Sequence, residues 1–124
     1  MANRFVHFEI VAENPEKAAE FYTKVFGWKI SKWEGGAVEY WLVMTGEKGE
    51  PGIDGGIVRA SMMPPGTKTI NTVMVEDIDA FQKKVTDAGG KVLVPKYSIP
   101  GVGQMAYCAD AEGVVFGLHT GEQK

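Results

Sequence analysis

Residues 7–28 read HFEIVAENPEKAAEFYTKVFGW and predict one strand that leads into one helix. At the start of this stretch, the apolar Phe8 and Ile10 alternate with the polar His7 and Glu9. An alternation of period two is typical of a strand that has one face against a core. We therefore expect His7 and Glu9 to share one face of a sheet.

The predicted helix has a start signal, an apolar face and a stop signal. Asn14 is suited to cap the first free amides, and Pro15 fits the first helical position because no N–H is needed there. Gly27 is placed to end the helix with a left-handed residue. Apolar side chains recur at spacings of three and four and so share one helical face: Ala18, Phe21, Tyr22, Val25 and Phe26.

The second half of the chain repeats this unit. Residues 71–90 read NTVMVEDIDAFQKKVTDAGG, in which Asp77 is suited to cap a helix and the final glycines to stop it. The sequence GIDGGI at 52–57 also resembles GVVFGL at 113–118. A chain that repeats its supersecondary unit is best interpreted as two packed copies.

Three further strands are predicted after each helix. They cover residues 28–33, 39–44 and 53–59 in the first half, and 91–94, 105–109 and 114–120 in the second. Pro95 is expected to end the strand before it, since proline cannot donate to a sheet.

The fold class predicted from this order is α+β, with two tandem βαβββ modules whose curved mixed sheets surround a shared cavity. We interpret residues 1–124 as a single domain with module one at 4–60, a linker at 61–67 and module two at 68–120. The linker contains paired prolines and is too short to join two free domains.

Composition excludes several classes of protein. With 124 residues, 44% hydrophobic and 23% charged, the chain is typical of a globular domain. The net charge is −3 and its Lys and Arg residues are scattered, so nucleic acid is not an expected partner. The apolar runs are far shorter than the roughly 20 residues of a membrane helix. A single Cys108 and an N-terminus without an apolar signal core predict a cytoplasmic protein.

With this order of elements, the chain resembles the vicinal oxygen chelate superfamily, which includes glyoxalase I, bleomycin-resistance proteins and extradiol dioxygenases. The resemblance is carried by AEFYTKVFGW at 19–28 and by the turn DAEG at 110–113. The stretch VPKYSIPGVG at 94–103, with a bend at its glycines, is similar to a small subfamily related to lactoylglutathione lyase.

The resemblance implies a divalent metal held by side chains on the first and last strands of each module. His7 matches the first of these positions. The others are Gly56 (or Gly55), Ile70 (or Asn71) and Gly117. Glycine and isoleucine have no donor atom, and a metal site needs three or more donors. We therefore predict that the usual metal site is absent and that the chain has no cofactor.

His7 and Glu9 are the candidate catalytic residues, as an acid–base pair; the alternative is a structural histidine satisfied within the sheet. His119 is a weak candidate that would complete a displaced metal site with them. We expect it to be exposed, because it lies close to the C-terminus. Cys108 lies in an apolar strand and is expected in the core, not as a nucleophile.

The predicted ligand-binding cavity is lined by His7, Glu9, Trp41, Thr72, Gln104 and Tyr107. On strand 39–44, either the set with Trp41 or the set with Tyr40 faces the cavity, and the pattern leaves both open. The aromatic residues equally fit a core or a dimer interface.

Three functions are compatible with these residues. The first is a small-molecule-binding protein that catalyses a lyase-like or isomerase-like reaction without the usual metal. The second is a non-catalytic dimer that sequesters a ligand or antibiotic. The third is a metal-dependent lyase or dioxygenase with displaced ligands. In each case we expect a homodimer, because a chain this short has little else to cover its sheets.

Overall fold

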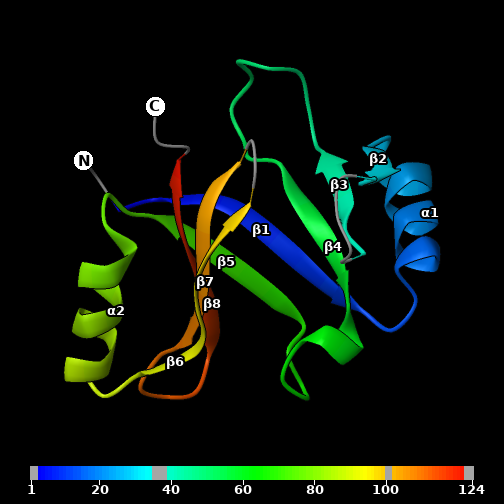
Figure 1. Cartoon of the computed structure of the whole chain (residues 1–124). Helices are drawn as coiled ribbons and strands as arrows, with labels where there is room; N and C mark the ends of the chain where they lie inside the picture. Colours follow the sequence, from blue (N-terminus) through cyan, green and yellow to red (C-terminus); the bar gives the residue numbers. More distant parts are fainter. Residues whose placement is uncertain (1–2, 35–38, 100–101, 122–124) are drawn as a thin grey trace. The chain divides into compact units, whose positions relative to one another are not determined.

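The computed structural model describes residues 3–34, 39–99 and 102–121. Within these ranges the chain forms eight β-strands and two α-helices, in the order βαβββ twice (Figure 1). A short 3-10 helix, η1 (Ala60–Met62), follows the first set. The predicted α+β class with two tandem βαβββ modules is confirmed.

The chain divides into two compact units, which are described separately. The N-terminal unit is His7–Ile70, and the C-terminal unit comprises Met1–Val6 with Asn71–Lys124. Two strands pass from one unit to the other, because β1 enters the N-terminal unit at His7 and β5 leaves it after Ile70.

The N-terminal unit contains one helix and four strands: β1 (Phe5–Ala12), α1 (Pro15–Phe26), β2 (Lys29–Lys32), β3 (Trp41–Met44) and β4 (Gly55–Arg59). The strands lie in the order β2-β3-β4-β1. The β1/β4 pair is parallel, and the other two pairs are antiparallel. In the core, Trp41, Val43 and Ile57 pack with Phe8 and Ile10 and with residues of α1.

Both ends of α1 form as predicted. The side chain of Asn14 accepts a hydrogen bond from the amide of Lys17 at 3.1 Å, and Pro15 is the first helical residue. Gly27 ends the helix in the left-handed region, at φ 73°, and its amide donates to the carbonyl of Thr23. This cap turns the chain directly into β2.

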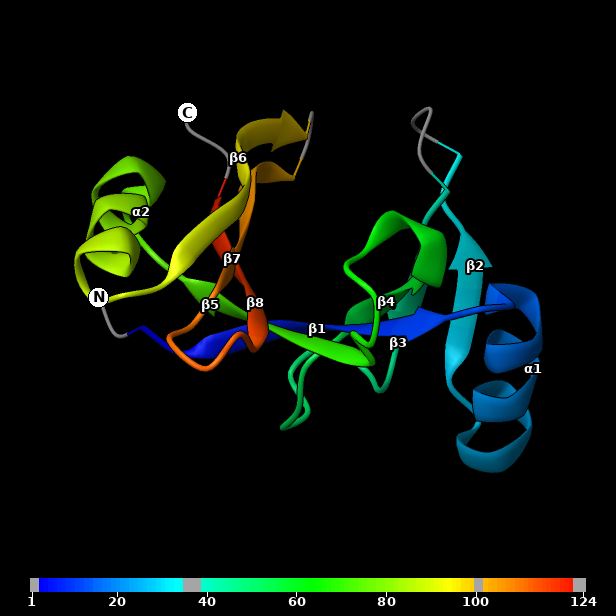
Figure 2. The ribbon, with the colours of Figure 1, turned by 90° about the horizontal axis from the view of Figure 1, so that it is seen from below.

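The C-terminal unit repeats the arrangement: β5 (Thr69–Met74), α2 (Ile78–Asp87), β6 (Lys91–Ile99), β7 (Gly103–Ala109) and β8 (Val115–Gly121). The strand order is β5-β8-β7-β6, with β5 and β8 parallel. Asp77 caps α2 by accepting from the amide of Ala80 at 3.2 Å. The helix covers one face of the unit's sheet (Figure 2), over a core of Val75, Ile78, Ala106, Cys108 and Leu118.

The prediction that Pro95 ends a strand is wrong, because β6 continues through it to Ile99. This strand lies at the end of the unit's strand order, and its pairing with β7 shifts on both sides of Val94. An edge strand tolerates a proline where no ladder bond is required of its nitrogen. Residues 100 and 101, which belong to the predicted bend, lie outside the described ranges.

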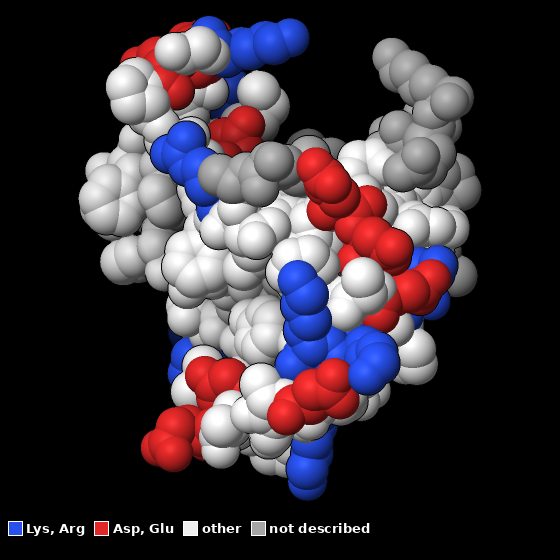
Figure 3. All heavy atoms as spheres, turned by 90° about the vertical axis from the view of Figure 1, so that its left-hand side faces the viewer, with Lys and Arg blue, Asp and Glu red and all other residues white. Residues whose placement is uncertain are grey.

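The described surface carries charges of both signs. On the face shown in Figure 3, Lys and Arg side chains lie among those of Asp and Glu. Among the described helices, neither α1 nor α2 is long and apolar enough to cross a membrane. Cys108 is fully buried in the α2 core, as predicted, and this burial raises the pKa of its thiol.

Candidate functional site

His7 and Glu9 lie on the face of β1 that points away from α1. Their neighbours Phe8 and Ile10 pack in the core under the helix, so the alternation of the strand directs His7 and Glu9 to the opposite side. His7 is half-buried, and Glu9 is 1% exposed. The two residues therefore share one sheet face, as the sequence predicted.

The imidazole of His7 contacts the phenol of Tyr40, which lies just before β3. The Nε2 atom of His7 and the hydroxyl oxygen of Tyr40 are 2.7 Å apart, in a partly buried hydrogen bond. Their rings are nearly parallel, with centroids 6.5 Å apart. Which atom donates depends on the tautomer of the histidine.

Gly56 makes room for the ring of Tyr40. In the register of β4, Gly56 lies opposite Glu9 on β1 and opposite Leu42 on β3. A Cβ atom at Gly56 would overlap the hydroxyl oxygen and ring carbons of Tyr40. A Cβ at Gly55 would instead overlap the carbonyl and ring of Phe8. Gly56 is therefore the position on the His7 face, which resolves the alternative that the sequence left open.

A charged cluster fixes the residue before Tyr40. Arg59 binds the carboxylate of Glu39 through two hydrogen bonds, of 3.1 and 3.2 Å, and the Lys32 ammonium lies 3.3 Å from the same carboxylate. Hydrogen bonds, the stronger from Arg59 and the weaker from Lys32, hold the pKa of the Glu39 carboxyl below its usual range. The carbonyl of Tyr40 also accepts from the amide of Trp33 at 2.7 Å.

Trp41 was predicted to line the cavity, but it lies on the face of β3 that packs in the core. It is 5% exposed and belongs to the core cluster with Val43 and Ile57. The cations of Lys32 and Arg59 lie over its ring, 5.3 and 5.8 Å from the centroid. Because side chains alternate along a strand, Tyr40 takes the place that the prediction gave to Trp41 on the His7 face.

The C-terminal unit carries a second polar group on the sheet face that points away from α2. Thr72 lies opposite Gly117 in the β5/β8 register, and Gly117 lies opposite Tyr107 on β7. A Cβ at Gly117 would lie 2.6 Å from the Thr72 hydroxyl. This hydroxyl is buried and has no hydrogen-bond partner among the described residues. Thr72 and Tyr107 therefore share one face of this unit, as the cavity prediction requires.

Gln104 and His119 differ from their predicted placement. The alternation of β7 puts Gln104 on the side of Ala106 and Cys108, which pack under α2, and so on the face opposite Tyr107. His119 is half-buried rather than exposed, because β8 continues past it, and its Nδ1 lies 3.2 Å from the carbonyl oxygen of Gln104. Burial lowers the pKa of His119, although the bond to Gln104 acts in the opposite direction.

The four positions at which the resemblance implies metal ligands follow from the two parallel pairs. Glu9 pairs with Gly56, and Thr72 pairs with Gly117, so that Ile70 is the counterpart of His7. Ile70 is fully buried and has no donor, and Tyr40 fills the space in front of Gly56. Among the described residues, no group of three or more His, Cys, Asp or Glu could hold a metal ion. These residues do not fit the implied metal site.

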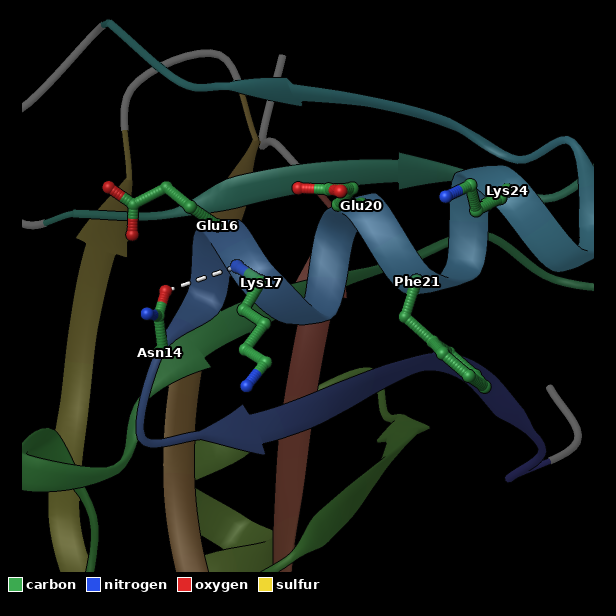
Figure 4. Close-up of a pocket in the computed structure, with 6 residues that line it drawn as sticks. All are labelled: Asn14, Glu16, Lys17, Glu20, Phe21 and Lys24. Carbon is green, nitrogen blue, oxygen red and sulfur yellow. Dashed lines mark hydrogen bonds between the residues drawn. The ribbon is translucent and has the colours of Figure 1, made fainter.

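A surface hollow of about 600 Å³ lies along α1 (Figure 4). It is lined by Asn14, Glu16, Lys17, Glu20, Phe21 and Lys24. The carboxylates and ammonium groups along this helix are of mixed sign, and the residues that the sequence singled out for the site are not among them. We do not place the site there.

Sequence reasoning left open whether Tyr40 or Trp41 faces the cavity, and it missed the contact of Tyr40 with His7. The available signal was Gly56 itself. A glycine within a buried strand often marks the close approach of another group, and here that group is the phenol that contacts His7.

Known proteins resemble the chain over nearly its whole length. A family model described as the Glyoxalase/Bleomycin resistance protein/Dioxygenase superfamily matches residues 4–118. A protein named "Putative glyoxylase CFP32", from Mycobacterium bovis, is 32% identical in an alignment 110 residues long that covers 82% of this chain and 39% of that protein. The chain thus spans about two-fifths of the length of this curated relative.

A second relative and a solved structure match most of both chains. A "Glyoxylase-like domain-containing protein" of Didymella fabae is 32% identical over 114 residues, with 90% of this chain and 89% of that protein covered. A methylmalonyl-CoA epimerase variant of Streptomyces coelicolor, in complex with 2-nitronate-propionyl-CoA, has a TM-score of 0.71 and 16% identity, with coverage of 99% and 100%. The structural likeness shows the fold, and the family model together with these relatives shows that the chain belongs to the glyoxalase/bleomycin resistance protein/dioxygenase superfamily.

Proposed function

We propose that the chain binds a small organic ligand at the sheet face of His7, Glu9 and Tyr40, and that it catalyses a lyase-like or isomerase-like reaction without the usual metal. The observation that supports this most directly is the 2.7 Å contact between His7 and Tyr40, on the same face as the buried Glu9. Titratable groups gathered at a partly buried position are characteristic of sites that transfer protons.

His7 and Glu9 have separate roles in this proposal. His7 exchanges a proton, because a neutral imidazole has one nitrogen that accepts a proton and one that donates a proton. Residues two apart in a strand lie on the same face with Cα atoms roughly 7 Å apart, so Glu9 is placed to orient the ligand or the imidazole of His7 from that face. The epimerase with this fold, solved with a propionyl-CoA derivative, supports the choice of a small organic ligand.

A second candidate is binding without chemistry, as in a protein that sequesters a ligand or antibiotic. Leu42 and Met44 share the Tyr40 face of β3 and are 43% and 51% exposed. Exposed apolar side chains beside a polar anchor favour retention of an apolar ligand. We include a homodimer and a cytoplasmic location in both candidates, as predictions from the sequence.

The test is a ligand screen by NMR, with 2-nitronate-propionyl-CoA as the first probe and a library of carbonyl and carboxylate fragments after it. We expect a binding compound to shift the resonances of His7 and Tyr40, and His7→Ala to weaken binding at least tenfold. His119→Gln is the control, because it changes the other histidine. Compounds that bind equally to the wild type and to His7→Ala would contradict the proposal.

Turnover separates the two candidates. If the wild type converts a compound and His7→Ala does not convert it, even at concentrations that saturate the weaker binding of the variant, the catalytic candidate is favoured. A compound that binds at the His7 face and is recovered unchanged would favour sequestration.

A further inference from the structure

The phenol of Tyr40 stands where a side chain at Gly56 would otherwise extend from β4. Resting on the proposed function, we propose that Tyr40 is a proton-relay residue that connects a ligand to His7. Its hydroxyl occupies the position at which the resemblance implies a metal-ligating side chain on the last strand of the module.

Gly56 is what permits this arrangement. A side chain at this position would start inside the volume of the Tyr40 hydroxyl, so any residue larger than glycine would push the phenol away from His7. The contact between His7 Nε2 and the Tyr40 oxygen is 2.7 Å, within the range of a well-formed hydrogen bond. Glycine at 56 and tyrosine at 40 are thus two parts of one geometry.

The backbone around Tyr40 is fixed by neighbouring strands. On one side, Glu39 is bound in bidentate fashion by Arg59, which lies at the end of β4. The carbonyl of Tyr40 itself accepts from Trp33, just after β2. Arg59 and Glu39 are therefore positioning residues, since they hold the chain from which the Tyr40 ring reaches across Gly56.

The relay conserves protons and charge. In the tautomer with its proton on Nδ1, His7 accepts a hydrogen bond at Nε2 from the Tyr40 hydroxyl. The Tyr40 oxygen takes a proton from the ligand as its own proton moves to Nε2. The products are an anionic ligand, a neutral Tyr40 and an imidazolium at His7, and the return of the proton to the other side or position of the ligand reverses these steps.

The test uses the nitrogen resonances of the two histidines of the chain, His7 and His119, in ¹⁵N-labelled protein. Tyr40→Phe removes only the hydroxyl. Gly56→Ala keeps the tyrosine in the sequence but displaces its ring from His7. We expect both variants to shift the Nε2 resonance of His7 in the same direction and to leave that of His119 unchanged. Tyr22→Phe and Gly121→Ala are matched controls, because Tyr22 lies on α1 and a Cβ at Gly121 would meet nothing within 4 Å.

Kinetics separate a relay from a purely structural bond. For a compound that the wild type converts, we expect Tyr40→Phe to lower kcat by about a hundredfold with a much smaller change in KM. Arg59→Gln should lower kcat in part, and Arg59→Lys should not restore it, because lysine cannot bind Glu39 through two bonds.

Two results would overturn the relay. One is a His7 Nε2 resonance that Tyr40→Phe and Gly56→Ala leave in place, and the other is full turnover by Tyr40→Phe. Failure of the proposed function would look different. Compounds would then bind independently of His7, while the Nε2 resonance of His7 would still respond to Tyr40→Phe and Gly56→Ala.

Discussion

Glu39 shows how one carboxylate couples the stability of the N-terminal unit to pH. Its pKa is lowered by hydrogen bonds from Arg59 and Lys32 in the folded chain. A carboxyl group with a lowered folded pKa stabilises the fold above its unfolded pKa of about 4.3, and this contribution is lost as the pH falls through the folded value.

We expect Glu39→Gln to lower the melting temperature at pH 7. The difference from the wild type should disappear in acid, at pH values below the folded pKa of Glu39, because both side chains are then neutral. Thermal unfolding followed by circular dichroism measures this, with Glu47→Gln as a control at an exposed loop position. A difference that stays constant down to acid pH would contradict the role given to the cluster.

His119 gives a second loss of stability as the pH falls, because a base is buried and not because an acid is hydrogen-bonded. Because burial lowers its pKa in the folded state, the unfolded chain takes up the proton first as the pH falls below about 6.5. The free energy of unfolding should therefore decrease from about pH 7.5 to pH 5.5, and less so in His119→Gln. Equal losses in the wild type and the variant, measured by urea unfolding at both pH values, would show that His119 does not contribute.

At the scale of the elements, the helix caps fix where α1 and α2 begin, and they were the most predictable features of the fold. Asn14, Pro15, Gly27 and Asp77 were assigned from residue type and spacing alone, and each takes the predicted position in the structure. These signals are local, since a capping side chain reaches an amide only three residues away.

We expect Asn14→Ala and Asp77→Ala each to lower the free energy of unfolding by about 1 kcal/mol. In each case the substitution leaves amides at the start of a helix without the side-chain acceptor. Serine at either position should restore most of the loss, because its hydroxyl also accepts from the first turn. Chemical denaturation of the four variants tests this, and alanine variants as stable as their serine counterparts would count against the caps.

The strands were harder to predict than the helices for a physical reason. Alternation fixes which residues share a face, but it does not say which face packs on the helix. The choice between Trp41 and Tyr40 therefore depended on the pairing of β3 with β4, which brings Trp41 opposite the core residue Ile57. Pro95 was misjudged because edge position, which makes proline tolerable, is a property of the sheet and not of the segment.

At the scale of the whole chain, the repeat of the βαβββ order and the family were predictable from sequence, whereas the partners within the site were not. The placement of His7 and Glu9 on one sheet face was predictable because they alternate with the core residues Phe8 and Ile10. The hydrogen bond to Tyr40 joins residues 33 positions apart and depends on the space above Gly56. Such a contact is visible only once the strand register is known.

The sequence also predicts a homodimer. Exposed apolar side chains on α1, such as Phe21 and Phe26 at 57% and 60%, agree with a surface that association would cover. Light scattering after gel filtration at micromolar concentration should give twice the chain mass. A single species at the mass of one chain would contradict this prediction.

The most direct test of the central claim is metal binding at His7. We infer that the Tyr40 phenol, and not a divalent ion, is the partner of this imidazole. Wild type and His7→Ala should be equilibrated with zinc, nickel or manganese, desalted, and analysed for metal by mass spectrometry. We predict far less than one ion per chain in both proteins. One ion per wild-type chain, lost in His7→Ala, would contradict the account.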